Sequence, residues 1–205
     1  MVEVINLTHL VKYFLIIIAY LLGSIPFALI VSKTAKGIDI RDYGSKNMGA
    51  TNVLRVLGLK YGLITFFLDA TKAAIIILLF KLGVLDENVH ALGHPLIYGI
   101  VAIIGHVFPV YANFKGGKAV ACSAGIVLVY SPLTFVICVA TFITIYLLTK
   151  IVSVSSISAT IAAVITAIIL KDWTFTFFIF IMAIIIIGRH GDNIKRLIKG
   201  KEKKV

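Results

Sequence analysis

Charged residues are scarce in this chain of 205 residues, and acidic residues are the scarcest of them. Only 14% of the residues are charged, with 9 Asp plus Glu against 20 Lys plus Arg, while 60% are hydrophobic and the mean hydropathy is +1.06. A soluble domain of this size does not need so much apolar surface. The composition therefore excludes a soluble enzyme and predicts an all-α, polytopic membrane helix bundle.

Further absences limit how the chain is organised. No linker rich in Pro, Gly or Ser, no low-complexity tract and no internal repeat divides it, so residues 1–205 are expected to form a single membrane domain. The two cysteines, Cys122 and Cys138, have the spacing of neither a zinc site nor a CxxC redox motif, and both are interpreted as buried small hydrophobic residues. The apolar run 11–32 is too long for a signal-peptide core and lacks a cleavage site, so it is interpreted as the first span.

Apolar stretches long enough to cross a bilayer, which takes about 20 residues, recur along the chain. We predict about seven transmembrane helices, at residues 10–32, 61–80, 92–111, 119–131, 132–149, 155–171 and 173–188. The fourth is short and could be a tilted or partial span, and Ser131-Pro132 marks the turn that follows it. Five spans are the alternative, if the short segments are re-entrant.

The basic residues are distributed unevenly among the loops of this layout. Sixteen of the 20 Lys and Arg residues lie on one side, three lie on the other, and Lys72 lies within a span. The positive-inside rule therefore predicts a cytoplasmic C-terminus and an outside N-terminus. Topology and anionic lipid headgroups account for the net charge of +11, so no nucleic-acid partner is expected.

The first of three polar stretches on the basic side is GSKNMGATNVLR, residues 44–55. Its glycines allow backbone N–H groups to approach an anion, and its hydroxyl and amide side chains add hydrogen bonds. Arginine holds phosphate oxygens with two donors, and Asn52 and Arg55 would share one face of a helix over 51–58. These features predict a site for an oxygen-rich anion rather than a plain loop.

The second stretch, residues 105–121, contains Lys115-Gly116-Gly117-Lys118 before an apolar segment. This pattern suggests an anion cradle leading into a helix N-terminus. A Walker loop is excluded, because it would need Gly at position 112 and Ser or Thr at position 119, where this chain has alanine. A plain helix junction remains open.

The third stretch, residues 189–202, follows the last span, and its Lys-rich end is interpreted as a lipid-gripping tail. His190 and Asn193 lie three residues apart on one helical face and could contact a phosphate ester or a hydroxyl nucleophile.

Ionisable groups also occur inside the spans. Asp69 and Lys72 stand three residues apart, and either a functional site or a structural ion pair fits them. His106 by itself suits a packed histidine as well as a catalyst.

Four motifs occur in order along nearly the whole chain. They are GSIPF at 23–27, DIRDYGSKNMGATNVLRVLG at 39–58, GHVFP with FKGGK, and RHGDNIKRL. Together they resemble the bacterial acyl-phosphate:glycerol-3-phosphate acyltransferase family of the inner membrane.

The resemblance implies transfer of a fatty acyl group from acyl phosphate to the 1-hydroxyl of glycerol 3-phosphate, with lysophosphatidic acid and phosphate as products. It implies no cofactor, no metal and no acyl-CoA. The expected partners are glycerol 3-phosphate, a long-chain acyl phosphate and membrane lipid. We expect a monomer in the bacterial inner membrane with its active site facing the cytoplasm.

The resemblance also implies the site residues by motif position. The expected catalytic residues are Ser45, Arg55, Lys118, His190 and Asn193. The expected substrate-binding residues are Asn47, Thr51, Asn52, Lys115, Gly116, Gly117 and Ser156, the last chosen from a cluster of serines at the start of the sixth span. Glu202 is expected to be structural. The chain departs from the family at Ala119, where glycine is usual, and at Cys122, where threonine is usual. A methyl group at position 119 would fit if that residue were helical.

No classical general base is evident in the loops, and the H-x-x-x-x-D pattern of acyl-CoA-dependent glycerol phosphate acyltransferases is absent. We therefore expect direct transfer, with a substrate phosphate oxygen taking the proton. A membrane transporter of a small organic phosphate is the alternative, although the clustering of polar motifs on one side favours an enzyme. A CDP-alcohol phosphotransferase lacks support because its aspartate-rich metal motif is missing.

Overall fold

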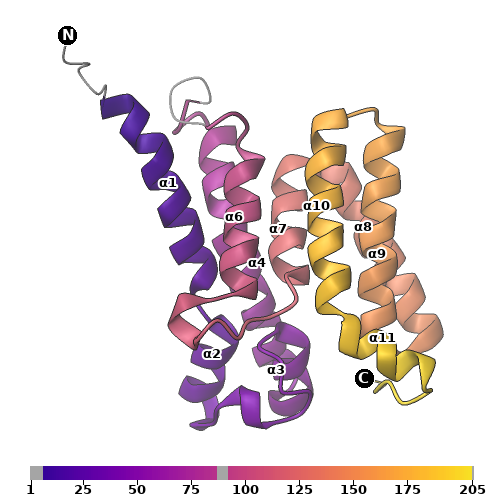
Figure 1. Ribbon diagram of the computed structural model, residues 1–205. Coiled ribbons are helices and arrows are strands. Elements are labelled where there is room, and N and C mark those ends of the chain that lie inside the picture. The colour runs from indigo at the N-terminus through magenta and orange to yellow at the C-terminus, as the bar shows by residue number, and fades with distance from the viewer. Residues whose placement is uncertain (1–6, 87–91, 205) are drawn as a thin grey trace.

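The computed structural model describes residues 7–86 and 92–204, and the regular elements in those ranges are all helical (Figure 1). The predicted domain 1–205 thus includes residues 1–6, 87–91 and 205, which lie outside the described residues. The helices are α1 (Leu7–Ser24), α2 (Phe27–Lys36), α3 (Ala50–Leu57), α4 (Leu59–Lys81), α6 (Leu96–Val107), α7 (Val120–Tyr130), α8 (Pro132–Thr149), α9 (Val152–Ile169), α10 (Trp173–Arg189) and α11 (Gly191–Ile198). Short 3₁₀ turns, η1 (Ile40–Asp42) and η2 (Val110–Ala112), lie in the loops.

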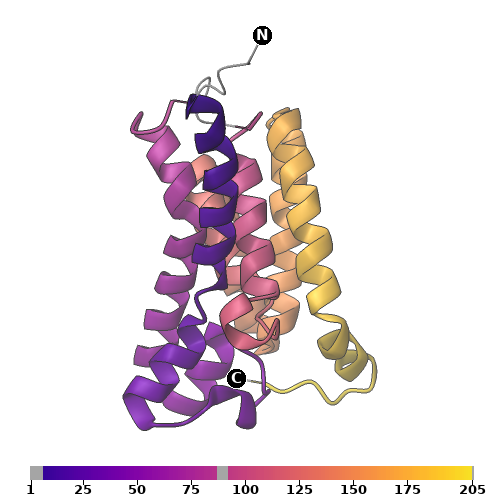
Figure 2. The same ribbon diagram turned by 60° about the vertical axis from the view of Figure 1, so that its left-hand side comes forward.

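The long helices run side by side in one bundle. Helix α1 packs on α6, α4 on α7, and α9 lies between α8 and α10. The short helices α2, α3 and α11 all lie at the end of the bundle opposite the first turn of α1 (Figures 1 and 2). This arrangement brings segments from the early, middle and late parts of the sequence together at one end of the bundle.

Proline residues set the boundaries that the apolar pattern did not reveal. The predicted span 10–32 is broken between Ser24 and Phe27, because Pro26 has no N–H and its ring obstructs a continuous helix. Likewise, the predicted span 92–111 is helical only over Leu96–Val107, between Pro95 and Pro109. Segment 132–149 coincides with α8.

Four candidate spans among the described residues are long and apolar enough to cross a membrane, and a fifth is possible. The four are Leu10–Lys36, Leu59–Lys81, Pro132–Thr149 and Val152–Ile169. Helices α10 and α11 meet at a bend of 57° and would count together as the fifth. Helices α6 and α7 are apolar but shorter. The chain is thus an all-helical membrane protein, and the count of seven stays a prediction.

Close helix packing depends on glycines at two crossings. A Cβ atom on Gly105 of α6 would lie 2.3 Å from the carbonyl oxygen of Tyr20 in α1. One on Gly125 of α7 would lie 2.2 Å from the carbonyl oxygen of Ala70 in α4. Backbones approach this closely only where the side chain is absent, which is a common way of packing helices in membranes.

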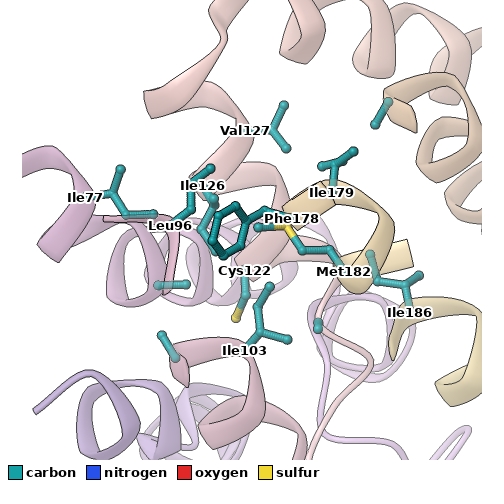
Figure 3. Packing of buried hydrophobic residues seen from close by; sticks show 14 of the residues in the cluster. Ile77, Leu96, Ile103, Cys122, Ile126, Val127, Phe178, Ile179, Met182 and Ile186 are labelled. Carbon is teal, nitrogen blue, oxygen red and sulfur yellow. The ribbon is translucent and has the colours of Figure 1, made fainter. Parts of the chain in front are cut away.

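Large apolar side chains fill the interior and also cover the outside. The main core joins α4, α6, α7, α9 and α10 around Ile103, Ile126, Phe178 and Met182 (Figure 3). On the outer surface, Leu148 is 76% exposed, and the described residues include many other exposed large hydrophobic side chains. Such a surface suits lipid, whereas a soluble monomer rarely exposes so much of it.

Candidate active site

A cavity of about 430 Å³ opens at the end of the bundle where α3 and α11 lie. Its walls come from the loop before α3, from α3 and α4, from the end of α6, from the first turns of α7 and α9, from α8, from α11 and its junction with α10, and from residues 202–203. The predicted site residues that line it are Ser45, Asn47, Thr51, Asn52, Arg55, Lys118, Ser156, His190 and Asn193. All five residues predicted to be catalytic therefore face one space, although 148 positions separate the first from the last.

The loop before α3 is held in shape by Asn52. The buried side chain of this residue accepts a hydrogen bond from the backbone N–H of Ser45 at 2.7 Å. Its Nδ2 donates to the carbonyls of Ile40 at 3.1 Å and Tyr43 at 3.0 Å. The amide of Asn52 thus binds the loop that carries Ser45, and Gly44, at φ +63°, makes the turn beside it.

Arg55 lies one helical turn after Asn52 in α3, on the cavity wall. Its side chain forms no hydrogen bond or ion pair with any other residue in 7–86 or 92–204. A guanidinium with unused donors on a cavity wall is suited to holding a phosphate or carboxylate with two parallel hydrogen bonds.

The KGGK segment is anchored to its neighbours by its glycines. The N–H of Gly117 donates to the carbonyl of His106 at 3.1 Å. The guanidinium of Arg189 donates to the carbonyls of Gly117 and Gly116, both at 3.2 Å. Lys115 is exposed, and none of the three residues 115–117 lines the cavity. The structure thus brings only Lys118 of this motif into the cavity.

Ala119 is not helical. It has φ +65° and precedes the first residue of α7, whose first turn lines the cavity with Val120 and Ala121. The left-handed backbone at this position normally favours glycine, because a Cβ atom costs about 1–2 kcal/mol there. The condition under which the methyl group of residue 119 would fit, a helical backbone, is therefore not met.

Lys118 meets a polar cluster from the C-terminal part of the chain. Its Nζ donates to Oδ1 of Asn193, and Nδ2 of Asn193 donates to the carboxylate of Glu202. Glu202 also accepts from Ser153 at 2.9 Å and from Arg196 at 2.6 Å. Burial lowers the pKa of Lys118 from 10.5 to about 8, although the charge of Glu202 opposes that shift.

His190 joins α10 to α11 and is buried, with 3% of its surface exposed. Its Nδ1 lies 2.7 Å from the carbonyl oxygen of Ile186. Because a carbonyl only accepts, Nδ1 carries the proton. Burial, helped by the nearby Lys118 charge, lowers the pKa of His190 to about 4. The ring is therefore neutral at pH 7, and its Nε2 can accept a hydrogen bond.

The serines at the start of α9 differ in what their side chains contact. Ser153 and Ser156 line the cavity, and Ser153 donates to Glu202. Ser155 donates instead to the carbonyl of Ile151 in its own helix, at 3.0 Å. The choice of Ser156 from the cluster is thus compatible with the cavity geometry.

The comparison with known proteins decides the class of this site. A family model described as glycerol-3-phosphate acyltransferase matches residues 13–200. The chain belongs to the glycerol-3-phosphate acyltransferase family. A curated glycerol-3-phosphate acyltransferase of Bacillus velezensis is 47% identical over 191 residues, which cover 93% of this chain and 96% of that protein.

Two solved structures have the same fold. Both are crystal structures of an integral membrane glycerol 3-phosphate acyltransferase. The glycerol 3-phosphate form is 38% identical, with a TM-score of 0.86 and 95% of each chain covered. The lysophosphatidic acid form is 37% identical, with a TM-score of 0.84 and 94% of each chain covered.

The predicted enzyme class is therefore confirmed, and the transporter alternative is not supported. The chain is a membrane acyltransferase of phospholipid synthesis that acylates glycerol 3-phosphate, and the product of that acylation is lysophosphatidic acid. The role of each site residue remains a prediction.

Sequence reasoning missed several residues of the cavity wall. Arg196 stands three residues after Asn193, so the helical spacing that singled out His190 and Asn193 could also have found it. Phe66 of α4 and Phe142 of α8 also line the cavity. No sequence signal distinguishes these two from the other aromatic residues of the spans.

Proposed function

We propose that this acyltransferase uses acyl phosphate as its donor and transfers the acyl group directly to the 1-hydroxyl of glycerol 3-phosphate. One observation carries the proposal: the cationic groups of Arg55, Lys118 and Arg196 share one cavity with the apolar side chains Phe66 and Phe142. This reaction requires that two phosphates and a fatty acyl chain be held together. The cavity offers cationic side chains for the phosphates and apolar side chains for the acyl chain.

The reaction needs little covalent help from the protein. The 1-hydroxyl oxygen of glycerol 3-phosphate attacks the carbonyl carbon of the mixed anhydride, and the bond from that carbon to the phosphate oxygen breaks. Inorganic phosphate leaves, and the hydroxyl proton passes to a phosphate oxygen. Because acyl phosphate is already activated, positioning and charge neutralisation can supply much of the acceleration.

The catalytic residues then have distinct tasks. Arg55 and Lys118 hold the two phosphates, and Asn193 keeps the Lys118 ammonium in place. Ser45 and His190 orient the reacting groups. A neutral imidazole with an accepting Nε2 suits the glycerol hydroxyl.

The other residues predicted to bind substrate contribute in different ways, according to whether they line the cavity. Asn47, Thr51 and Ser156 line the cavity and offer polar side chains to substrate. Asn52 contributes chiefly through the loop that it holds. Gly116 and Gly117 act through the backbone of their loop, and exposed Lys115 attracts anions toward it.

We also propose seven spans in a single membrane domain, with an outside N-terminus, a cytoplasmic C-terminus and the cavity facing the cytoplasm. Sixteen basic residues on the side of the polar motifs support this orientation. The membrane would be the bacterial inner membrane, and the Lys-rich tail would contact anionic lipid. We also expect a monomer.

A single reconstitution tests the donor. Purified protein is mixed with palmitoyl phosphate and glycerol 3-phosphate, without CoA and with a metal chelator, and lysophosphatidic acid is measured. Palmitoyl-CoA in place of palmitoyl phosphate is the control and should give no product. Product from the thioester alone, or uptake of glycerol 3-phosphate into liposomes without product, would contradict the proposal.

Two further results bear on the mechanism. His190→Ala should lower kcat/KM by about 10²-fold, as expected for loss of a positioning group at the reacting atoms. Wild-type activity in that variant would show that His190 has another role. Isolation of a covalent acyl-enzyme on Ser45 or Cys122 would exclude direct transfer.

A further inference from the structure

Three ionisable side chains lie buried at or beside the cavity wall, in the apolar helices α4 and α6. Asp69 and Lys72 of α4 and His106 of α6 have 1%, 6% and 6% of their surfaces exposed. Burying such groups is costly unless they are paired, so their presence calls for a specific role. Asp69 and His106 line the cavity together with Lys118.

The carboxylate of Asp69 joins the other two groups. Its Oδ1 lies 2.7 Å from Nζ of Lys72 and 3.6 Å from Nδ1 of His106. The Lys72 ammonium in turn donates to the carbonyl of Ile25 at 2.6 Å, in the break between α1 and α2. Asp69 is therefore linked to the broken first span on one side and to the end of α6 on the other.

His106 continues this connection to the KGGK segment. Its carbonyl accepts the N–H of Gly117 at 3.1 Å, and its ring lies directly against the same residue. A Cβ atom added to Gly117 would lie only 2.2 Å from Nε2 of His106. Because Lys118 follows immediately, the position of the His106 ring limits where the Lys118 backbone can lie.

We propose that Asp69 is a positioning residue that acts through His106 and Gly117 to place Lys118 for phosphate binding. This inference rests on the proposed role of Lys118 and extends it to a residue that does not touch the phosphate. Through Lys72, the same carboxylate ties the break at Ile25 to the cavity floor, so two separate segments are fixed from one buried point.

A metal site is the competing interpretation of the same residues. Asp69, His106 and Cys122 each offer one ligand atom, and these atoms lie within 4.8 Å of one another. The Lys72 ammonium, however, is 2.7 Å from the carboxylate. A cation already neutralises that group and would repel a metal ion, so the positioning role is favoured.

The test is glycerol 3-phosphate binding by calorimetry, because it needs no acyl donor. Asp69→Asn should raise the Kd, and in turnover assays the KM for glycerol 3-phosphate, by about tenfold, the lower end of what loss of such supporting partners costs. His106→Phe keeps a ring against Gly117 but removes the contact with Asp69, and it should have the same effect. The double variant should be no weaker than either single variant, because both act along one chain of contacts.

Asp172→Ala is the control for lost stability at a place away from the cavity. This carboxylate caps α10 at the end of that helix away from His190 and accepts the N–H of Phe175 at 2.8 Å. Its loss should lower the melting temperature while leaving the Kd unchanged.

The outcomes separate the positioning role from a purely structural one. A fall in the amount of folded protein with an unchanged Kd in both Asp69→Asn and His106→Phe would overturn the proposal. If Asp69→Asn does not fold, His106→Phe decides alone. Wild-type protein that binds glycerol 3-phosphate but makes no product from palmitoyl phosphate would contradict the proposed donor without affecting this inference.

Discussion

The loop that carries Ser45 should open readily when Asn52 is replaced by alanine. In the structure, this one buried side chain makes three hydrogen bonds, to the N–H of Ser45 and to the carbonyls of Ile40 and Tyr43. Alanine removes all three, so the N–H of Ser45 loses its acceptor, while the carbonyls of Ile40 and Tyr43 keep the backbone N–H groups of Tyr43 at 3.3 Å and Lys46 at 2.9 Å.

The size of the effect follows from the number of bonds. A hydrogen bond contributes about 1 kcal/mol net, so three contribute about 3 kcal/mol to keeping the loop closed. Since about 1.4 kcal/mol is a factor of ten, the open fraction of the loop should rise on the order of a hundredfold. Asn52→Asp keeps the acceptor for Ser45 but turns a buried carboxylate oxygen toward two carbonyl oxygens, so it should open the loop at least as much as alanine does.

Limited trypsin digestion of detergent-solubilised protein measures this opening. Lys46 lies in the loop and is exposed, and intact mass spectrometry identifies cleavage after it. When opening is fast relative to cleavage, the cleavage rate follows the open population. The rate should be lowest in the wild type and higher in both Asn52→Ala and Asn52→Asp, and kcat/KM should fall in parallel because Ser45 moves with the loop.

Thr34→Val is the control, because within residues 7–86 and 92–204 the Thr34 hydroxyl bonds only to its own helix, at the carbonyls of Ile30 and Val31. Cleavage after Lys46 in Asn52→Ala that stays within about threefold of the wild-type rate would refute the reasoning from hydrogen bonds. Asn52 would then act mainly as a substrate contact.

Two other predictions follow from Lys118 and Ala119. The pKa of Lys118 is lowered to about 8, so its positive charge is present below that pH and is lost as the pH rises through it; kcat/KM for glycerol 3-phosphate should therefore fall above about pH 8. Lys118→Arg should move that fall to higher pH, and an unchanged profile would show that another group titrates. Ala119→Gly should keep or raise the melting temperature, since glycine relieves about 1–2 kcal/mol of strain at φ +65°. Ala124→Gly, inside α7, should cost about 1 kcal/mol, and equal destabilisation by the two variants would contradict the strain argument.

Much of the fold could be predicted because membrane helices are long apolar runs. Segment 132–149 coincides with α8, and the short fourth segment is the short helix α7. The break at Pro26 was missed because the residues on both sides are equally apolar. A hydropathy value averaged over a window of residues does not change when one N–H group is lost. The helical hydrogen bonding of the backbone, however, is interrupted at that residue.

Most residues of the candidate site could also be predicted from the sequence. Nine of the twelve predicted site residues line the cavity, because polar groups in so apolar a chain have few reasons other than a ligand to be there. Gly116 and Gly117 do not line it, since the helix end at His106 and the Arg189 guanidinium bind their backbone, and Lys115 is exposed outside it. Such contacts depend on segments far apart in the sequence.

The amino-acid sequence by itself determined the membrane class, the family and the three polar motifs, because composition and motif order are local properties. Only the tertiary structure decided that Lys118 binds Asn193, that burial lowers the pKa of His190 and that Asp69 is connected to the KGGK segment. Those properties depend on burial and on which groups meet in space. Helix packing sets both, through crossings such as that of Gly125 with Ala70.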